Sequence, residues 1–216
     1  MSAALLSARS LYCERDDRIL FEGLDLNLSS GEILQIEGRN GSGKTTLLRI
    51  LSGLSNHFEG ELFWRGETMG EAKESFLAEL VYIGHQPGVS DLLTAEENLK
   101  WHCALHPSLD ASLIEYAINQ VGLTGFEDVP AFQLSAGQKR RIALARLYMS
   151  NAQLWILDEP FTAIDKLGVA AKEDLMLKHL SKGGSVILTT HQDLSAHMPL
   201  RKLILGQSKE AQYIEQ

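Results

Sequence analysis

A glycine-rich segment that ends in a lysine and a threonine is the first feature of this sequence that suggests chemistry. It reads Gly38-Arg-Asn-Gly-Ser-Gly-Lys-Thr45 and matches the pattern GxxxxGK[ST]. Closely spaced glycines let a loop wrap phosphate oxygens with backbone N–H groups, and the start of a following helix adds partial positive charge. Lys44 would reach the β- and γ-phosphates of a nucleotide, and Thr45 would supply a hydroxyl to Mg²⁺. The predicted nucleotide-binding residues are Gly38, Arg39, Asn40, Gly41, Ser42, Gly43, Lys44, Thr45 and Thr46.

Two adjacent carboxylates follow a short apolar run in the segment Leu154-Trp-Ile-Leu-Asp-Glu-Pro160. In a protein with a phosphate-binding loop, the aspartate at such a strand end holds the Mg²⁺ shell, and Asp158 is the candidate. Glu159 is placed to orient and deprotonate a water that attacks the γ-phosphate. Without the loop, two acidic residues after a strand would more often form a solvated edge. Together, the two segments predict nucleotide hydrolysis.

The segment Leu134-Ser-Ala-Gly-Gln138, followed by the basic run Lys139–Arg141, narrows the family. It resembles the signature of the ABC ATPase superfamily, LSGGQ followed by a basic helix, with Ala136 where glycine is usual. A helix that starts near Ser135 aims its N–H groups at an anion. In that superfamily the anion is the γ-phosphate held by the opposite subunit, so the resemblance implies a homodimer. The residues assigned to this trans signature are Ser135, Ala136, Gly137 and Gln138. Without the family, Lys139–Arg141 is open to interpretation as a solvated basic stripe.

Other elements of the ABC superfamily appear in the expected order, and the resemblance assigns their roles. Gln86 corresponds to the glutamine that contacts Mg²⁺ and the attacking water, and Asp165 lies in a segment similar to the loop that crosses the dimer. His191 corresponds to the histidine on the γ-phosphate, although a histidine at a strand end is by itself usually structural. The implied cofactors are ATP and Mg²⁺. The implied catalytic residues are Glu159, His191, Gln86 and Lys44, and the implied metal ligands are Thr45, Gln86 and Asp158.

The position that binds the adenine departs from the family pattern. The superfamily usually stacks the base on an aromatic residue about two dozen residues before the phosphate-binding loop, and here that position is Arg15. A guanidinium plane can stack on a base, and Tyr12 lies nearby. Either residue is a candidate for adenine stacking, and both are equally open to interpretation as plain hairpin residues.

Several further stretches are similar to one branch of the superfamily, the CcmA family, which comprises the ATP-binding subunits of bacterial cytochrome c maturation (Ccm) systems. They are Cys13–Arg18, Ile83–Gly88, Leu93–Asn98, Gly125–Asp128 and Leu154–Asp165. The resemblance implies integral membrane partners of the CcmB type, together with CcmC-, CcmD- and CcmE-like proteins. It also implies a peripheral position at the cytoplasmic face of the bacterial inner membrane. ATP hydrolysis would power either heme export or the release of a heme-loaded chaperone.

Other functions compete with that of a transporter motor. Soluble ABC ATPases that act on nucleic acid or ribosomes generally carry two motor domains or long coiled-coil insertions, which are not evident here. The net charge of −8 also argues against a nucleic-acid partner. A non-hydrolysing nucleotide sensor is opposed by Glu159 and His191. Direct heme binding is not expected, because the adjacent His102 and Cys103 belong to no attachment motif and no axial pair is evident.

These motifs need a sheet to position them. Residues Leu11–Leu28 alternate in two bursts, as in an antiparallel hairpin. The run Thr45–Leu54 has helical spacing, so the glycine-rich segment lies between a strand and a helix, which disfavours a chance turn. Four short runs rich in Ile, Leu and Val predict buried strands of a mostly parallel sheet. They are Ile33–Glu37, Leu80–Gly84, Leu154–Leu157 and Val186–Thr189.

The stretch between Gln86 and Leu134 has a different pattern. Thr94–Leu105 and Ala111–Val121 predict helices, and no strand is evident there. The tail, at Lys202–Leu205 and Gln212–Ile214, predicts a last strand pair. The fold class is therefore α/β, a P-loop NTPase core of the ABC ATPase type with an N-terminal antiparallel β-subdomain. We expect a single domain, residues 1–216, in which a helical subdomain at 87–133 is inserted between core segments 1–86 and 134–216.

The composition fits this organisation. The chain has 216 residues, of which 44% are hydrophobic and 22% charged, enough for one globular core. Cys13 and Cys103 lie outside any CxxC pattern, which is typical of unlinked thiols in a reducing compartment. No apolar run approaches the roughly 20 residues that span a bilayer. We expect a soluble, cytoplasmic chain that another chain holds at the membrane.

Overall fold

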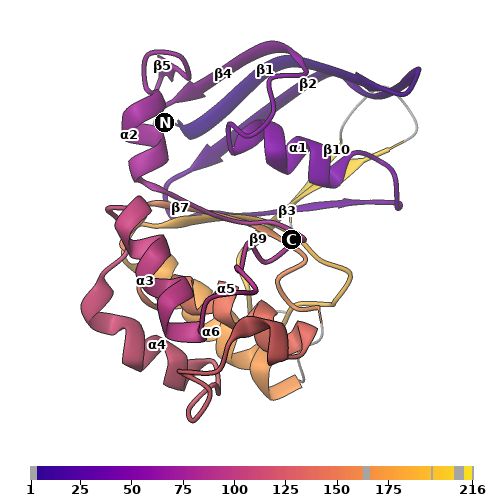
Figure 1. Cartoon of the computed structure of the whole chain (residues 1–216). Helices are drawn as coiled ribbons and strands as arrows, with labels where there is room; N and C mark the ends of the chain where they lie inside the picture. The colour runs from indigo at the N-terminus through magenta and orange to yellow at the C-terminus, as the bar shows by residue number, and fades with distance from the viewer. Residues whose placement is uncertain (1–3, 163–165, 196, 207–211, 216) are drawn as a thin grey trace.

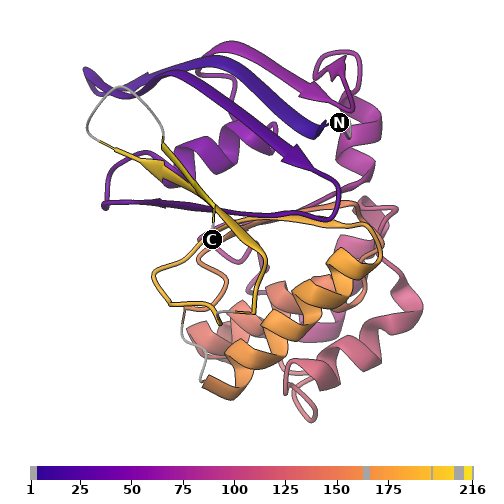
Figure 2. The same ribbon diagram turned by 180° about the vertical axis from the view of Figure 1, so that it is seen from behind.

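Two β-sheets, one helix between them and a group of helices on the far side form the layers of the fold (Figures 1 and 2). The computed structural model describes residues 4–162, 166–195, 197–206 and 212–215. The strands are β1 (Ala4–Arg15), β2 (Arg18–Ser29), β3 (Ile33–Gly38), β4 (Glu59–Trp64), β5 (Glu67–Thr68), β6 (Leu80–Ile83), β7 (Leu154–Asp158), β8 (Ser185–Thr189), β9 (Leu200–Leu205) and β10 (Gln212–Glu215). The helices are α1 (Lys44–Leu51), α2 (Lys73–Ala78), α3 (Ala95–Leu105), α4 (Ile114–Gln120), α5 (Ala136–Tyr148) and α6 (Lys166–Ser181), with 3₁₀ turns at Ala111–Leu113 and Ala131–Gln133.

The larger sheet has six strands in the order β10-β9-β3-β8-β7-β6. Its strands β9, β3, β8, β7 and β6 are parallel, and β10 pairs antiparallel with β9 at one edge. All four runs predicted as buried parallel strands are therefore confirmed, as is the predicted final strand pair. The five residues of β7 are all buried, because apolar layers cover both faces of this sheet.

Alternate residues of the central strands point to opposite faces of the sheet and pack into two separate hydrophobic cores. Leu34 and Ile36 of β3 pack with α1 and with the antiparallel sheet β2-β1-β4-β5. Ile33, on the opposite face, packs with the helices α3, α5 and α6. Figures 1 and 2 show α1 between the two sheets and the helical group across the larger sheet. The position of α1 matters for function, because its first residue directly follows the glycine-rich loop.

The N-terminal hairpin is confirmed, with β1 and β2 paired along their length. Its turn consists of Asp16 and Asp17, which have φ angles of 52° and 56°. Aspartate tolerates this left-handed region better than most residues, and two successive positive φ values match the twist of a hairpin. The turn carries Arg15 and Arg18 at its two ends.

The helices predicted between Gln86 and Leu134 are present, with changed boundaries. Thr94 is the N-cap of α3, where its hydroxyl accepts from the Glu97 N–H and the Glu97 side chain accepts from the Thr94 N–H. The second predicted helix divides into a 3₁₀ turn at Ala111–Leu113 and α4. No strand occurs in residues 87–133, all of which the structure describes. The division of the chain into core and subdomain at these residues stays a prediction.

Two further parts of the fold differ from the sequence-based expectation. Helix α1 ends at Leu51 and not at Leu54, because Gly53 has a φ of 72° and cannot continue the helix. The strands β4 and β5 and the helix α2 were not predicted. In β4 the first three residues, from Glu59 to Glu61, are exposed, and this hides the apolar alternation that marks a strand.

Candidate nucleotide-binding and hydrolysis site

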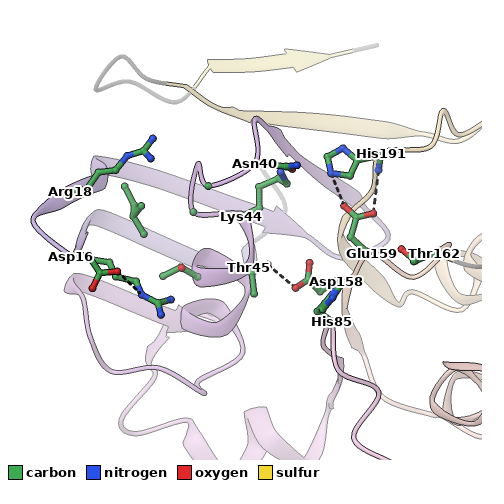
Figure 3. A pocket seen from close by; sticks show the side chains of 15 residues that line it. Asp16, Arg18, Asn40, Lys44, Thr45, His85, Asp158, Glu159, Thr162 and His191 are labelled. Atoms are coloured by element: carbon green, nitrogen blue, oxygen red, sulfur yellow. Dashed lines mark hydrogen bonds and ion pairs between the residues drawn. The ribbon is translucent and has the colours of Figure 1, made fainter. Parts of the chain in front are cut away.

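A pocket of about 650 Å³ lies where the hairpin, the start of α1 and the ends of β7 and β8 meet. Its lining residues are Arg15, Asp16, Arg18, Leu20, Asn40, Gly41, Gly43, Lys44, Thr45, Thr46, His85, Asp158, Glu159, Thr162 and His191. Figure 3 shows Lys44 and Thr45 in the middle of the pocket, the hairpin residues at one end and the carboxylates at the other. Residues up to 176 positions apart in the sequence, from Arg15 to His191, thus line one cavity.

The glycine-rich segment forms a tight loop between β3 and α1. A Cβ atom on Gly38 would lie 2.7 Å from the carbonyl oxygen of Leu205, so that only glycine fits there. Gly41 and Gly43 have φ angles of 77° and 96°. The Lys44 ammonium donates to the carbonyl oxygen of Gly38, at 2.7 Å, and therefore lies over the loop. Gly43 caps α1 without a side-chain hydrogen bond, which leaves the first N–H groups of the helix available to an anion.

Asp158 is held by two hydroxyl groups from different elements. The Thr45 hydroxyl donates to Oδ2 at 2.9 Å, and the Thr189 hydroxyl donates to Oδ1 at 2.7 Å. Asp158 and Thr189 are register partners at the ends of the neighbouring parallel strands β7 and β8. The side chain of Asp158 is buried next to the first turn of α1, and hydrogen bonds fix the direction of both its oxygens.

Glu159 takes a strained backbone conformation directly after β7, with a φ of 51°. Its N–H donates to the hydroxyl of Thr189 at 3.0 Å and to the Thr189 carbonyl oxygen at 3.2 Å. Its carboxylate accepts from the His191 N–H at 3.3 Å, and the His191 ring Nε2 lies 3.5 Å from the other carboxylate oxygen. Figure 3 shows these two side chains facing each other. A carboxylate and an imidazole thus lie together at one end of the pocket.

The pair formed by Thr45 and Asp158 fits a hard divalent cation. Hydroxyl and carboxylate oxygens are the ligands that Mg²⁺ prefers, and neighbouring ligands of its octahedron, at about 2.1 Å from the metal, lie about 3 Å apart. The two oxygen atoms are 2.9 Å apart here. Among the described residues no group of three or more His, Cys, Asp or Glu side chains converges on a metal position. A cation at this place would therefore take most of its ligands from phosphate oxygens and water.

At the hairpin end, only one of the two candidates for base stacking lines the pocket. Arg15 lines the pocket, together with Asp16, Arg18 and Leu20, whereas Tyr12 is not among the lining residues. The Tyr12 hydroxyl donates to Glu14 at 2.6 Å, and this hydrogen bond to a carboxylate raises the pKa of Tyr12 to about 12. Arg15 itself lies 3.7 Å from the Asp16 carboxylate.

Besides Tyr12, four residues predicted for this site do not line the pocket, namely Gly38, Arg39, Ser42 and Gln86, and several residues that do line it were not predicted. Gln86 is exposed and His85 takes its place in the lining. Asp165 falls outside the residues that the structure describes. The residues that the sequence analysis missed include Thr189, whose only signal was its place at the end of the predicted strand Val186–Thr189. Arg18 and Leu20 carried no signal, since they look like ordinary hairpin residues.

Comparisons with known proteins agree on one family. A family model described as ABC transporter matches residues 21–162. A protein of Hahella chejuensis named cytochrome c biogenesis ATP-binding export protein CcmA is 53% identical over 94% of this chain and 96% of the relative. Proteins of the same name from Vibrio vulnificus and Salmonella typhi are 53% and 54% identical over 94% and 93% of this chain, and over 100% and 97% of their own lengths. The chain belongs to the CcmA family of ABC transporter subunits.

Solved structures agree on the fold of this CcmA family member. A putative ABC transporter ATP-binding protein from Pyrococcus furiosus has a TM-score of 0.77 at 25% identity and covers 93% of this chain and 96% of its own. A dimeric ATP-binding cassette bound to ADP and Pi, described as a post-hydrolysis state, has a TM-score of 0.84 at 22% identity, over 97% and 98% of the two chains. In the described part of the chain, none of the helices has the length and apolar character needed to cross a membrane.

The signature segment of this family member begins helix α5, away from the pocket of its own chain. Ser135 is the N-cap, and it exchanges hydrogen bonds with Gln138 in a capping box. Ser135 and Ala136 are exposed. Ala136 does not have a positive φ, so alanine replaces the usual glycine there without backbone strain. This exposed helix start is available to a ligand held by another molecule.

Proposed function

We propose that two copies of this chain close head to tail around two ATP molecules and that hydrolysis reopens them, driving a membrane step of cytochrome c biogenesis. The observation that carries this proposal is the pairing of Glu159 with His191 at one end of the pocket that Lys44 also lines. A carboxylate held there is suited to activate a water next to a terminal phosphate. The site and the similarity to CcmA proteins both support an ATPase of the ABC type.

The phosphates of ATP are bound by the glycine-rich loop and by Lys44. The Lys44 ammonium exchanges its contact with the Gly38 carbonyl for the phosphate oxygens, which are stronger acceptors. Thr45 and Asp158 would hold Mg²⁺, which supplies positive charge against the β- and γ-phosphate oxygens when it is bound. Gln86 would join this site only after its loop moves, because His85 lines the pocket in the present conformation.

Glu159 takes a proton from the attacking water, and His191 contacts the γ-phosphate. The two N–H contacts with Thr189 hold the Glu159 main chain while its carboxylate turns toward the nucleotide. Ser135, Gly137 and their helix start complete the site of the opposite copy, where the α5 N–H groups face the γ-phosphate. The segment that contains Asp165 resembles the dimer-crossing loop of the superfamily, and we assign it that role.

The membrane step is carried out with partner chains. The relatives are named export proteins of cytochrome c biogenesis, and this supports a CcmB-like membrane partner together with CcmC-, CcmD- and CcmE-like proteins. The chain then lies peripherally at the cytoplasmic face of the bacterial inner membrane. The work done is heme export or the release of a heme-loaded chaperone.

Replacing Glu159 with glutamine tests the proposal. The Glu159→Gln chain is expected to bind ATP with near-normal affinity and to lose about 100- to 10,000-fold in turnover, because the general base is gone. It should accumulate as an ATP-bound dimer in size-exclusion chromatography. Near-normal phosphate release would rule out Glu159 as the base. Purification of the tagged chain from membranes tests the partners, and partners unrelated to cytochrome biogenesis would overturn the role in cytochrome c biogenesis while leaving the ATPase assignment intact.

A further inference from the structure

Arg140 of helix α5 contacts the backbone that carries the proposed catalytic carboxylate. It is buried, with 7% of its surface exposed, whereas Lys139 and Arg141 on either side of it are partly exposed. The idea of a solvated basic stripe is therefore wrong for Arg140. One end of its guanidinium donates to the carbonyl oxygen of Gly84 at 2.6 Å. The other end donates to the carbonyl oxygens of Asp158 and Glu159 at 2.6 Å and 2.9 Å.

These three carbonyl oxygens lie just beyond or at the ends of two neighbouring strands. Gly84 follows β6, the edge strand of the larger sheet, and Asp158 and Glu159 lie at the end of β7. The planar guanidinium can serve all three acceptors at once, because its N–H groups point in fixed and diverging directions. An ammonium group is a single point of charge and cannot span the same set of carbonyl groups.

Glu159 needs such support because its backbone is in the left-handed region, with a φ of 51°. A residue with a Cβ atom is unstable in that region unless its surroundings fix it. Thr189 fixes the Glu159 N–H, and Arg140 fixes the Glu159 carbonyl oxygen. Both ends of the residue are thereby restrained, and its carboxylate accepts a hydrogen bond from the His191 N–H.

We propose that Arg140 is a positioning residue that aims the Glu159 carboxylate at the attacking water of its own copy, acting through the main chain of Asp158 and Glu159. The inference rests on the proposed function, since it assigns a task to the support of Glu159. It also gives helix α5 two roles. Its N-terminus presents the signature to the nucleotide of the opposite copy. Arg140, on the same helix, holds the main chain of the catalytic carboxylate in the chain's own site.

The neighbouring Arg141 is a matched control. It lies on the same helix and also donates to a carbonyl oxygen, that of Gly122 at 3.1 Å, but Gly122 lies just after the C-cap of α4 and outside the pocket. Replacing Arg141 with glutamine removes a similar contact without touching the pocket. Arg140→Lys is the conservative variant, which keeps the positive charge and removes the diverging N–H groups of the guanidinium.

The first experiment measures kcat, KM, nucleotide affinity and thermal stability for Arg140→Gln, Arg140→Lys and Arg141→Gln in the full complex. A misplacement of about 1 Å costs about 100-fold in rate, so we expect kcat of Arg140→Gln to fall about 10- to 100-fold. Affinity for ATP should be retained, and ATP-dependent dimers should still form in the Glu159→Gln background. Arg140→Lys should recover only part of the rate. A parallel loss of folding or ATP binding would show a structural role and overturn the inference, as would unchanged kcat in a folded variant.

A second experiment separates the two roles of α5. A mixed dimer with Glu159→Gln in one copy has a single competent site. Arg140→Gln is then added either to the copy that retains Glu159 or to the copy that lends it the signature. We expect the loss of turnover only in the first arrangement. A loss confined to the second arrangement would mean that Arg140 acts through the signature, which overturns the inference.

The failure of the inference is distinguishable from that of the proposed function. If Glu159→Gln retains normal turnover, the proposed function fails. If Glu159→Gln is inactive while Arg140→Gln turns over normally, only the role of Arg140 fails.

Discussion

The two ends of the pocket are built very differently. At the carboxylate end, Asp158 is buried and receives hydrogen bonds from two threonine hydroxyls, and Glu159 is fixed at both its N–H and its carbonyl oxygen. At the hairpin end, the Arg15 and Asp16 side chains are 72% and 93% exposed and lie 3.7 Å apart in a loose ion pair. The first end rests on the central strands of a sheet, and the second rests on a two-residue turn.

This difference indicates how a nucleotide is recognised. Directed hydrogen bonds from buried groups give strong and specific contacts with phosphate and metal. Exposed charges on a turn contribute little binding energy and favour no particular base. We therefore expect binding and catalysis to depend strongly on the carboxylate end and weakly on the hairpin end. The following variants test that contrast, in order of decreasing effect.

Lys44→Ala should have the largest effect on binding. The side chain loses charge-assisted hydrogen bonds to phosphate, each about 1.5–3 kcal/mol, so ATP affinity should fall about 10- to 100-fold. Turnover should fall with it. Titration of a fluorescent ATP analogue measures the affinity, and Lys100→Ala, a surface lysine on α3 paired with Glu96, is the control. Unaltered affinity in Lys44→Ala would place the phosphates elsewhere.

Thr189→Val should lower turnover more than binding. The variant removes the donor to Asp158 Oδ1 and one of the two acceptors of the Glu159 N–H. A buried polar group that loses its partner costs about 1–3 kcal/mol, and because Asp158 keeps its hydrogen bond from Thr45 we expect a cost in the lower part of this range, about a 10-fold loss in kcat. Steady-state phosphate release measures this loss. Thr189→Ser retains the hydroxyl and should keep most of the rate; an equally slow Thr189→Ser would contradict the hydrogen-bond explanation.

Arg15→Tyr should increase the affinity for nucleotides at the hairpin end. Stacking of a base on an aromatic ring contributes about 1–3 kcal/mol, and part of this is already supplied by the exposed guanidinium, so a gain of about 5-fold is expected. Competition between ATP and GTP, measured in both proteins, reports base selection. A marked preference for ATP in the unaltered chain, lost on Arg15→Ala, would show that this end is more selective than its structure indicates.

Arg18→Gln should have the smallest effect. The Arg18 guanidinium lies near Gly41 of the phosphate-binding loop, and a Cβ on that glycine would be 3.8 Å from it. An exposed charge contributes about 0.2–1 kcal/mol, so nucleotide affinity should fall about 2-fold. The difference should vanish in about 1 M salt, where the screening length is about 3 Å. A large and salt-independent loss would assign Arg18 a direct phosphate contact.

The sequence predicted the parts of this protein that local patterns encode. The glycine-rich loop is continuous along the chain, and its conformation follows from glycines that permit positive φ angles. The buried strands were recognisable because strands covered on both faces consist of continuous apolar runs. The start of helix α5 near Ser135 was recognisable from the resemblance of Leu134–Gln138 to the LSGGQ signature, which is local because Ser135 and Gln138 cap the helix within a single turn.

Only the tertiary structure decided which distant groups meet. Thr189 contacts Asp158 because β7 and β8 are parallel neighbours in register. The sequence of neither strand indicates which strand it pairs with. Arg140 looked like part of an exposed basic run until packing buried it against carbonyl groups of residues 84, 158 and 159. The hairpin turn decided that Arg15 and not Tyr12 lines the pocket. Hydrogen bonds between residues far apart in sequence depend on strand order and register, which are set by the burial of the whole core rather than by any one segment.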